Sequence, residues 1–168
     1  LKGLVEDLRK TIISICIALF FTFVCACERV EENYLSENVE YAAAQYDLLI
    51  EKLEKNGKPW APRTVDTKGN IVYARNVWDW TSGFFAGSLW YLYNLTGDEK
   101  WKTLAKKYTE ALKQQQYITS HHDIGFIIGC SYLNGMRMGQ EAYDTIIVQA
   151  AKSLSTRFRS GAGVIQSW

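Results

Sequence analysis

Two stretches of this sequence repeat the same pattern at a separation of 42 residues. Residues 83–87 (GFFAG) match residues 125–129 (GFIIG), and residues 97–101 match residues 139–143 in the same way. Each copy comprises a very apolar segment, a glycine-containing turn and a segment with the apolar spacing of an amphipathic helix. A period of this length is typical of stacked helical hairpins, so the sequence predicts an all-α fold.

The apolar segments distinguish between two ways of stacking such hairpins. Residues 81–93 and 121–134 are apolar on every side, which predicts helices that are buried all round. The helices of an open solenoid usually keep a polar side, whereas the inner helices of a closed α/α barrel have none. We therefore favour an α/α barrel, with the amphipathic helices of residues 98–116 and 139–158 on its outside. The glycines of each inner helix lie four residues apart, which leaves room for a close neighbour or a ligand.

The remaining segments are a leading helix and a connector. Residues 36–55 have the apolar spacing of an amphipathic helix, and residues 57–79 form a connector with a short extended piece at 71–73. The leading helix and the two repeats amount to about two and a half hairpins, which cannot close a ring. We therefore expect an incomplete α/α barrel, formed by the N-terminal part of a longer protein.

The first 27 residues have the features of a targeting segment. Basic residues precede an apolar run over residues 11–24, which is too short to span a membrane comfortably. The run ends in Val24-Cys25-Ala26-Cys27, which resembles a bacterial lipobox. The expected organisation is a lipoprotein signal peptide over residues 1–27, a tether over residues 28–37 and the N-terminal part of the barrel domain over residues 38–168.

Acylation of Cys27 would anchor the protein to a membrane without spanning it. We therefore expect a location in the bacterial cell envelope, on the periplasmic side or at the cell surface. The alternative is that the apolar run is a short transmembrane anchor or a buried helix. Apart from Cys27, the mature chain would keep only Cys130, which lies in an apolar run where a buried thiol is expected.

The composition limits the classes of function. Hydrophobic residues make up 48% of the chain and charged residues 22%, which suffices for a packed core. A net charge of +1 gives no electrostatic basis for binding nucleic acid. Aromatic residues make up 14%, and this excess suits either a carbohydrate-facing surface, because rings stack on sugar faces, or an aromatic core.

Polar residues stand at the start of each buried segment. In the repeat, residues 79–81 align with residues 121–123, so that Trp80 corresponds to His122 and Thr81 to Asp123. Because the inner helices of a barrel start at a common mouth, these residues should share one rim. Loops at such a rim are where binding groups are usually carried.

Two interpretations of Asp123 stay open at this point. Asp is a favoured N-cap residue that contributes about 1 kcal/mol to a helix, and Thr81 at the equivalent position supports this role. A carboxylate at the mouth of a barrel can equally act as an acid or a base. The adjacent His121 and His122 point in different directions on a helix start and no second pair of ligands follows, so neither a metal nor a cofactor is expected.

The motifs resemble those of a known family. Residues 79–90 (DWTSGFFAGSLW) and 121–126 (HHDIGF) resemble the two N-terminal motifs of glycoside hydrolase family 88, the unsaturated glucuronyl hydrolases. Residues 62–63 and 163–168 are also similar to family sequence, so the resemblance covers roughly residues 36–168. The related unsaturated rhamnogalacturonyl hydrolases share the fold and a looser form of the pattern.

The resemblance implies a six-hairpin α/α toroid that acts after polysaccharide lyases. Lyases leave a 4,5-unsaturated uronic acid at the non-reducing end of an oligosaccharide, and the family removes this sugar by hydrating its vinyl-ether double bond. The resemblance also implies that Asp123 is one of two catalytic Asp residues and that Trp80, His122 and Trp168 line the substrate subsite.

The second Asp of the family pattern would lie beyond Trp168, so we expect the 168-residue chain alone to be inactive. A protein of another class is the alternative interpretation. The chain could be a lipid-anchored glycan-binding or helical-repeat scaffold protein, which would use the aromatic rim without catalysis.

Overall fold

The structure is a computed structural model that describes residues 2–55, 61–74 and 78–167. Within the first of these ranges, the side chains of residues 2–8 and 18–32 lie outside the description. The predicted lipidation site Cys27 and the predicted substrate residue Trp168 therefore lie outside the described side chains. The chain divides into two compact units, Leu1–Asp47 and Leu48–Trp168.

The first unit is helical and contains most of α1 (Lys2–Lys55). The side chains of residues 9–17 are exposed in it, and Ile12, Ile13, Ile15 and Ile17 are each about half exposed. Residues 28–37, the expected tether, are helical, and the boundaries of the leader and the tether stay predictions. Within the described ranges, no helix combines the length and the apolar character needed to cross a membrane.

The second unit opens with the last turns of α1, where Ile50 and Leu53 are buried. A small antiparallel ribbon follows, in which β1 (Pro62–Val65) pairs with β2 (Ile71–Tyr73). The extended piece expected at residues 71–73 is confirmed as β2. Its partner β1 was not predicted, because a four-residue strand in a connector leaves almost no periodic signal.

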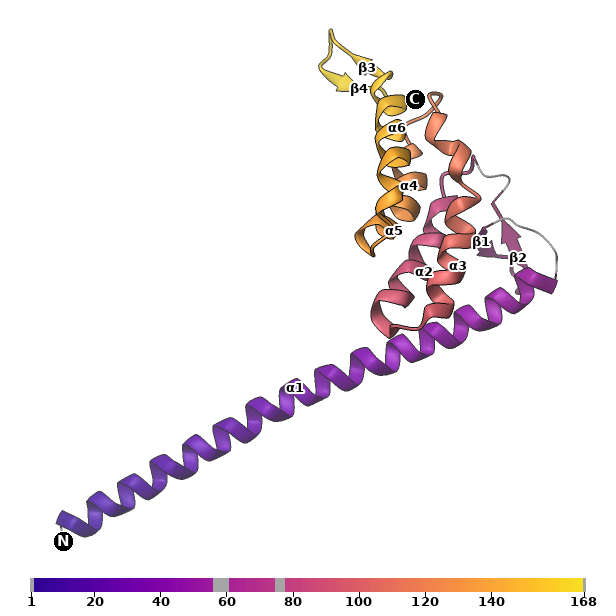
Figure 1. The fold of residues 1–168 in the computed structure, drawn as a ribbon. Helices are drawn as coiled ribbons and strands as arrows, with labels where there is room; N and C mark the ends of the chain where they lie inside the picture. The colour runs from indigo at the N-terminus through magenta and orange to yellow at the C-terminus, as the bar shows by residue number, and fades with distance from the viewer. Residues whose placement is uncertain (1, 56–60, 75–77, 168) are drawn as a thin grey trace. The chain divides into compact units, whose positions relative to one another are not determined.

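Helices α2 (Ser82–Thr96) and α3 (Glu99–Glu110) form the first hairpin of this unit (Figure 1). Gly97 ends α2 with a φ of 69°, in the left-handed region that favours glycine. Asp98 then caps α3, because its side chain accepts a hydrogen bond of 2.9 Å from the backbone N–H of Lys100. The predicted pair of helices is confirmed for this repeat, with most but not all of the first helix buried.

The second hairpin is less regular than the first. A short 3-10 helix, η1 (Lys113–Tyr117), precedes it. The buried helix expected over residues 121–134 is divided into α4 (Ile124–Ile128), the π-helical turn η2 (Gly129–Leu133) and α5 (Asn134–Arg137). Its amphipathic partner consists of the 3-10 turn η3 (Glu141–Tyr143) and α6 (Asp144–Ser155).

A second small ribbon follows α6. Strand β3 (Phe158–Arg159) pairs antiparallel with β4 (Val164–Ile165) on either side of a loop at residues 160–163. These strands were not predicted, since each has only two residues. The ribbon places residues 166 and 167 beside Arg157, because the backbone N–H of Gln166 donates to the carbonyl of Arg157 at 2.9 Å.

Large aromatic side chains fill the core between the two hairpins. Trp90 and Trp101 are almost completely buried, and the Trp90 indole N–H donates a hydrogen bond of 3.0 Å to the Thr109 hydroxyl. The rings of Tyr132 and Tyr143 meet edge to face, with centroids 4.7 Å apart. Burial raises the pKa of both tyrosine hydroxyls above their usual range, so both stay protonated at neutral pH.

Glycines let the two inner helices touch backbone to backbone. A Cβ atom on Gly83 of α2 would lie 2.4 Å from the carbonyl oxygen of Ile127, and a Cβ atom on Gly87 would lie 2.7 Å from that of Cys130. No side chain other than hydrogen fits at either position. The room that the glycine spacing predicted is therefore used by the neighbouring inner helix.

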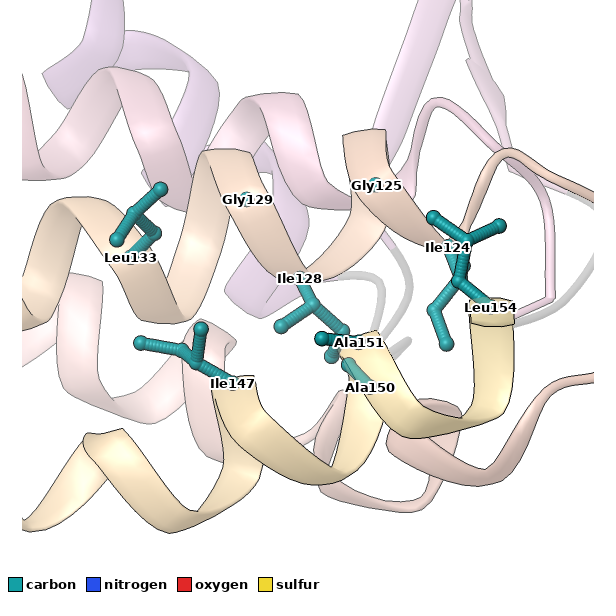
Figure 2. Close-up of a pocket in the computed structure, with 9 residues that line it drawn as sticks. All are labelled: Ile124, Gly125, Ile128, Gly129, Leu133, Ile147, Ala150, Ala151 and Leu154. Carbon is teal, nitrogen blue, oxygen red and sulfur yellow. The ribbon is translucent and has the colours of Figure 1, made fainter. Parts of the chain in front are cut away.

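The equivalent glycines of the second repeat face open space. A Cβ atom on Gly125 or Gly129 would have no neighbour within 4 Å. Both residues line a pocket of about 220 Å³ between α4–η2 and α6 (Figure 2). Its lining is entirely apolar: Ile124, Gly125, Ile128, Gly129, Leu133, Ile147, Ala150, Ala151 and Leu154. Sugar hydroxyls would find no side-chain partner there, so this pocket is not the candidate site.

The two equivalent glycines provide a matched test of the backbone contact. Gly83→Ala should lower the free energy of unfolding by about 1–3 kcal/mol, because the new methyl group would collide with the carbonyl of Ile127. Gly125→Ala, in the same place of the second repeat, should be neutral or stabilise by up to about 1 kcal/mol, since alanine favours a helix. Urea unfolding of both variants of this chain measures the difference, and equal effects would contradict the close contact.

Candidate functional site

The turns that precede α2 and α4 occupy equivalent positions in the two hairpins. Trp80, in the turn before α2, has its ring centroid 5.9 Å from that of Phe126 in α4. Phe84, in the first turn of α2, lies 5.8 Å from each of the other two rings. The starts of the two inner helices therefore lie side by side, which is the arrangement that the repeat predicted.

These three rings, Trp80, Phe84 and Phe126, form what we call the aromatic cluster. Their exposed fractions are 43%, 39% and 45%, so each ring offers a large part of its surface to solvent. Exposed apolar groups that gather in one place mark a binding surface more often than scattered ones do. Of the two interpretations of the aromatic excess, a carbohydrate-facing surface is the one that suits this cluster.

The expectation that the inner helices are buried on every side was wrong at Tyr91, which is 52% exposed, and at Phe84 and Phe126. Phe84 and Phe126 lie in the first turn of an inner helix, where the helix reaches the rim and leaves the packed core. The sequence carried a signal for this exception. The two residues are equivalent in the repeat and stand three residues after Thr81 and Asp123 respectively, which places them on the same helix side as the polar rim residues.

Asp79 has a structural role in the first turn. One of its carboxylate oxygens accepts hydrogen bonds from the backbone N–H of Thr81 at 3.0 Å and from the Thr81 hydroxyl at 2.7 Å. The other oxygen lies 3.3 Å from the guanidinium of Arg63 in β1. These contacts close the turn that presents Trp80.

Asp123 occupies the N-cap position of α4, but its side chain makes no capping hydrogen bond. Its backbone has φ −69° and ψ −5°, which is helical, whereas a capping residue normally has an extended backbone. Asp98 illustrates the difference, because it has ψ 116° and does cap α3. The capping interpretation of Asp123 is therefore not realised, and its carboxylate is left for other contacts.

Asp123 is only 6% exposed, and the imidazoles of His121 and His122 lie close to its carboxylate. His122 Nε2 lies 3.3 Å from Oδ1, and His121 Nδ1 lies 3.7 Å from Oδ2. A buried carboxylate needs a charged or hydrogen-bonding partner, and His122 lies near enough to supply one, whereas 3.7 Å from His121 Nδ1 is too long for a hydrogen bond. The expectation that the adjacent histidines point apart was wrong in this respect, since both rings face the same carboxyl group.

The site contains groups for proton transfer. Among the described residues, no three His, Cys, Asp or Glu side chains lie close enough together to hold a metal ion. A buried carboxyl group beside an imidazole can hold a proton and pass it to a bound molecule. The aromatic cluster beside it can take the apolar face of a ring-shaped ligand.

The chain matches a family model described as glycosyl hydrolase family 76 over residues 35–168. The curated relatives carry a different enzyme name. The unsaturated glucuronyl hydrolase of Formosa agariphila is 29% identical over 169 residues, which cover 95% of this chain and 42% of that protein. The unsaturated glucuronyl hydrolase of Bacillus sp. strain GL1 is 34% identical over 112 residues, which cover 64% of this chain and 29% of that protein. This chain thus spans less than half the length of these two relatives.

Solved structures agree with the curated relatives. An unsaturated glucuronyl hydrolase specific for heparin matches with a TM-score of 0.62 and 40% identity, over 66% of this chain and 30% of the other. The unsaturated glucuronyl hydrolase of Bacillus sp. GL1 matches with a TM-score of 0.62 and 32% identity, over 70% of this chain and 32% of the other. These enzymes are α/α barrels, so the predicted fold class is confirmed.

The matching family model is not that of family 88, which the motifs resemble. The model and the relatives agree on a glycoside hydrolase and differ in the enzyme family within that class. By the extent of the family match the chain belongs to glycosyl hydrolase family 76, and it shares the α/α-barrel fold of the unsaturated glucuronyl hydrolases.

Proposed function

We propose that the protein containing this chain releases a 4,5-unsaturated uronic acid from the non-reducing end of oligosaccharides made by polysaccharide lyases. The observation that carries the proposal is the Asp123 carboxyl group, which is buried, makes no capping bond and faces two imidazoles. The exposed aromatic cluster nearby supports a sugar as the ligand. The names of the relatives support the unsaturated sugar in particular.

The proposed reaction is the hydration of a vinyl ether. One carbon of the double bond takes a proton from an acid, and water adds to the other carbon while a base takes its proton. The hydrated sugar then opens, which breaks its link to the next sugar. Asp123 is suited to hold or accept a proton because His122 lies against one of its oxygens. The family resemblance assigns the second carboxyl group to a residue that follows Trp168.

We propose that the protein is of the unsaturated glucuronyl hydrolase type within the glycoside hydrolases, which is the activity that the resemblance to family 88 implies. The support comes from the two rim motifs and from the names of relatives and solved structures that are 29–40% identical. The match to the family 76 model supports a glycoside hydrolase, but the relatives and solved structures reported above are all named unsaturated glucuronyl hydrolases. A hydrolase for ordinary saturated glycosides is therefore the second candidate.

We also propose that acyl chains on Cys27 hold the protein at the bacterial cell envelope. The apolar run of residues 11–24 and the lipobox-like segment that ends at Cys27 support this. Labelling of expressing bacteria with an alkyne fatty acid should mark the wild-type protein and not Cys27→Ser. Equal labelling of both would contradict the anchor.

Asp123→Asn tests the proposed role of the carboxyl group. In the full-length protein this change should lower kcat on an unsaturated disaccharide by about 10²- to 10⁴-fold, because an amide cannot exchange protons. Loss of the ultraviolet absorbance of the conjugated acid measures the rate. Asp98→Asn is the matched control and should keep activity, since Asn caps α3 as well as Asp does. Wild-type turnover that survives in Asp123→Asn would overturn the assignment.

The aromatic cluster should contribute to substrate binding. Phe84→Leu in the full-length protein should raise KM for the unsaturated disaccharide by about 2- to 10-fold, because a ring stacked on the sugar is lost. Tyr91→Leu is the control, since Tyr91 is an exposed aromatic residue of the same helix outside the cluster. The same KM for both variants would show that the cluster does not touch the substrate.

A further inference from the structure

Arg157 links segments of the chain that are far apart in sequence. It follows α6 directly and its guanidinium group donates three hydrogen bonds, all to backbone carbonyl oxygens. The acceptors are Thr119 at 2.9 Å, Gln166 at 2.9 Å and Ser167 at 3.1 Å. The planar guanidinium fork has five N–H donors and is always charged, so it is suited to hold several carbonyls at once.

One of these carbonyls, that of Ser167, also contacts a histidine of the candidate site. His122 Nδ1 lies 2.8 Å from the Ser167 carbonyl oxygen and 3.3 Å from the Ser167 hydroxyl. A carbonyl oxygen can only accept a hydrogen bond, so Nδ1 must carry a hydrogen in this arrangement. The contact therefore selects one form of the imidazole ring of His122.

The selected form leaves the other ring nitrogen for Asp123. His122 Nε2 lies 3.3 Å from Oδ1 of Asp123, and a hydrogen bond between them needs a proton on one of the two atoms. With Nδ1 held by the carbonyl, Nε2 is the ring nitrogen that faces Oδ1 of Asp123. If Nδ1 lost its carbonyl partner, the ring could turn over and exchange its two nitrogens, and Nε2 would no longer be directed at the carboxyl group.

We propose that Arg157 is a positioning residue, which acts through the Ser167 carbonyl to keep a hydrogen on Nδ1 of His122 and so to direct Nε2 at Asp123. Its bond to Thr119 supports this role, because Thr119 lies three residues before His122 and Arg157 thereby fixes both sides of the contact. The kinetic consequence of this inference rests on the proposed function, whereas the state of the imidazole ring does not.

The neighbouring ribbon provides a matched control. Arg159 lies two residues further on, in β3, and its Nε donates a hydrogen bond of 2.7 Å to the side-chain oxygen of Gln166. That bond reaches neither the backbone of residue 167 nor the segment before His122. Loss of the Arg159 side chain therefore removes a similar charge from the same ribbon without touching the proposed chain of contacts.

The test compares Arg157→Gln, Arg157→Lys and Arg159→Gln in the full-length protein by two-bond ¹⁵N–¹H spectra of the imidazole rings. The signals of His122 are assigned by their loss in His122→Gln. In the wild type and in Arg159→Gln we expect the signature of a ring with a hydrogen on Nδ1. In Arg157→Gln this signature should be lost, and Arg157→Lys should retain part of it, because an ammonium group can replace only some of the three bonds.

The kinetic arm uses the unsaturated disaccharide. Arg157→Gln should lower kcat by about 10- to 100-fold with little change in KM, because the reacting group would be misplaced. Arg159→Gln should leave both constants unchanged. An unchanged Nδ1 signature in Arg157→Gln would overturn the inference, whatever its effect on rate. If the wild type fails to act on the disaccharide, the proposed function fails, and the spectra still decide the role of Arg157.

Discussion

The close approach of α2 to the α4–η2 segment is the contact on which the rest of the second unit depends. Gly83 and Gly87 leave no side chain between the helices, so carbonyl oxygens of the second helix lie where Cβ atoms would be. This fixes the two helix starts side by side. Trp80, Phe84 and Phe126 then meet at distances below 6 Å, and Asp123 comes to the same rim.

Asp123 shows how a local preference gives way to a site. An Asp at an N-cap usually contributes about 1 kcal/mol by accepting a backbone hydrogen bond, as Asp98 does for α3. The helical backbone at Asp123 forgoes that contribution and leaves the carboxylate to His121 and His122. A residue that breaks its own local rule at the mouth of an inner helix is what a functional position is expected to look like.

The repeat was sufficient to predict the helices and the shared rim, because apolar periodicity and glycine spacing are local signals. The exposure of Phe84 and Phe126 was missed although both stand three residues after a polar rim residue, because the apolar pattern of a helix does not by itself reveal which turn reaches solvent. It also could not predict the role of Arg157. This side chain donates to the backbone carbonyl of Thr119, which is 38 residues away, and every residue type carries such a carbonyl, so the sequence gives no sign of the contact. The π-helical turn and the two-residue strands likewise depend on tertiary contacts rather than on sequence pattern.

We propose that this rim serves an enzyme for unsaturated sugars. The most direct measurement compares initial rates of the full-length protein on a 4,5-unsaturated uronyl disaccharide and on its saturated counterpart, with release of the second sugar followed by chromatography. A vinyl-ether hydration needs the double bond, so we expect the second sugar to be released from the unsaturated disaccharide alone. Cleavage of the saturated disaccharide at a comparable rate would contradict it and would favour an ordinary glycoside hydrolase.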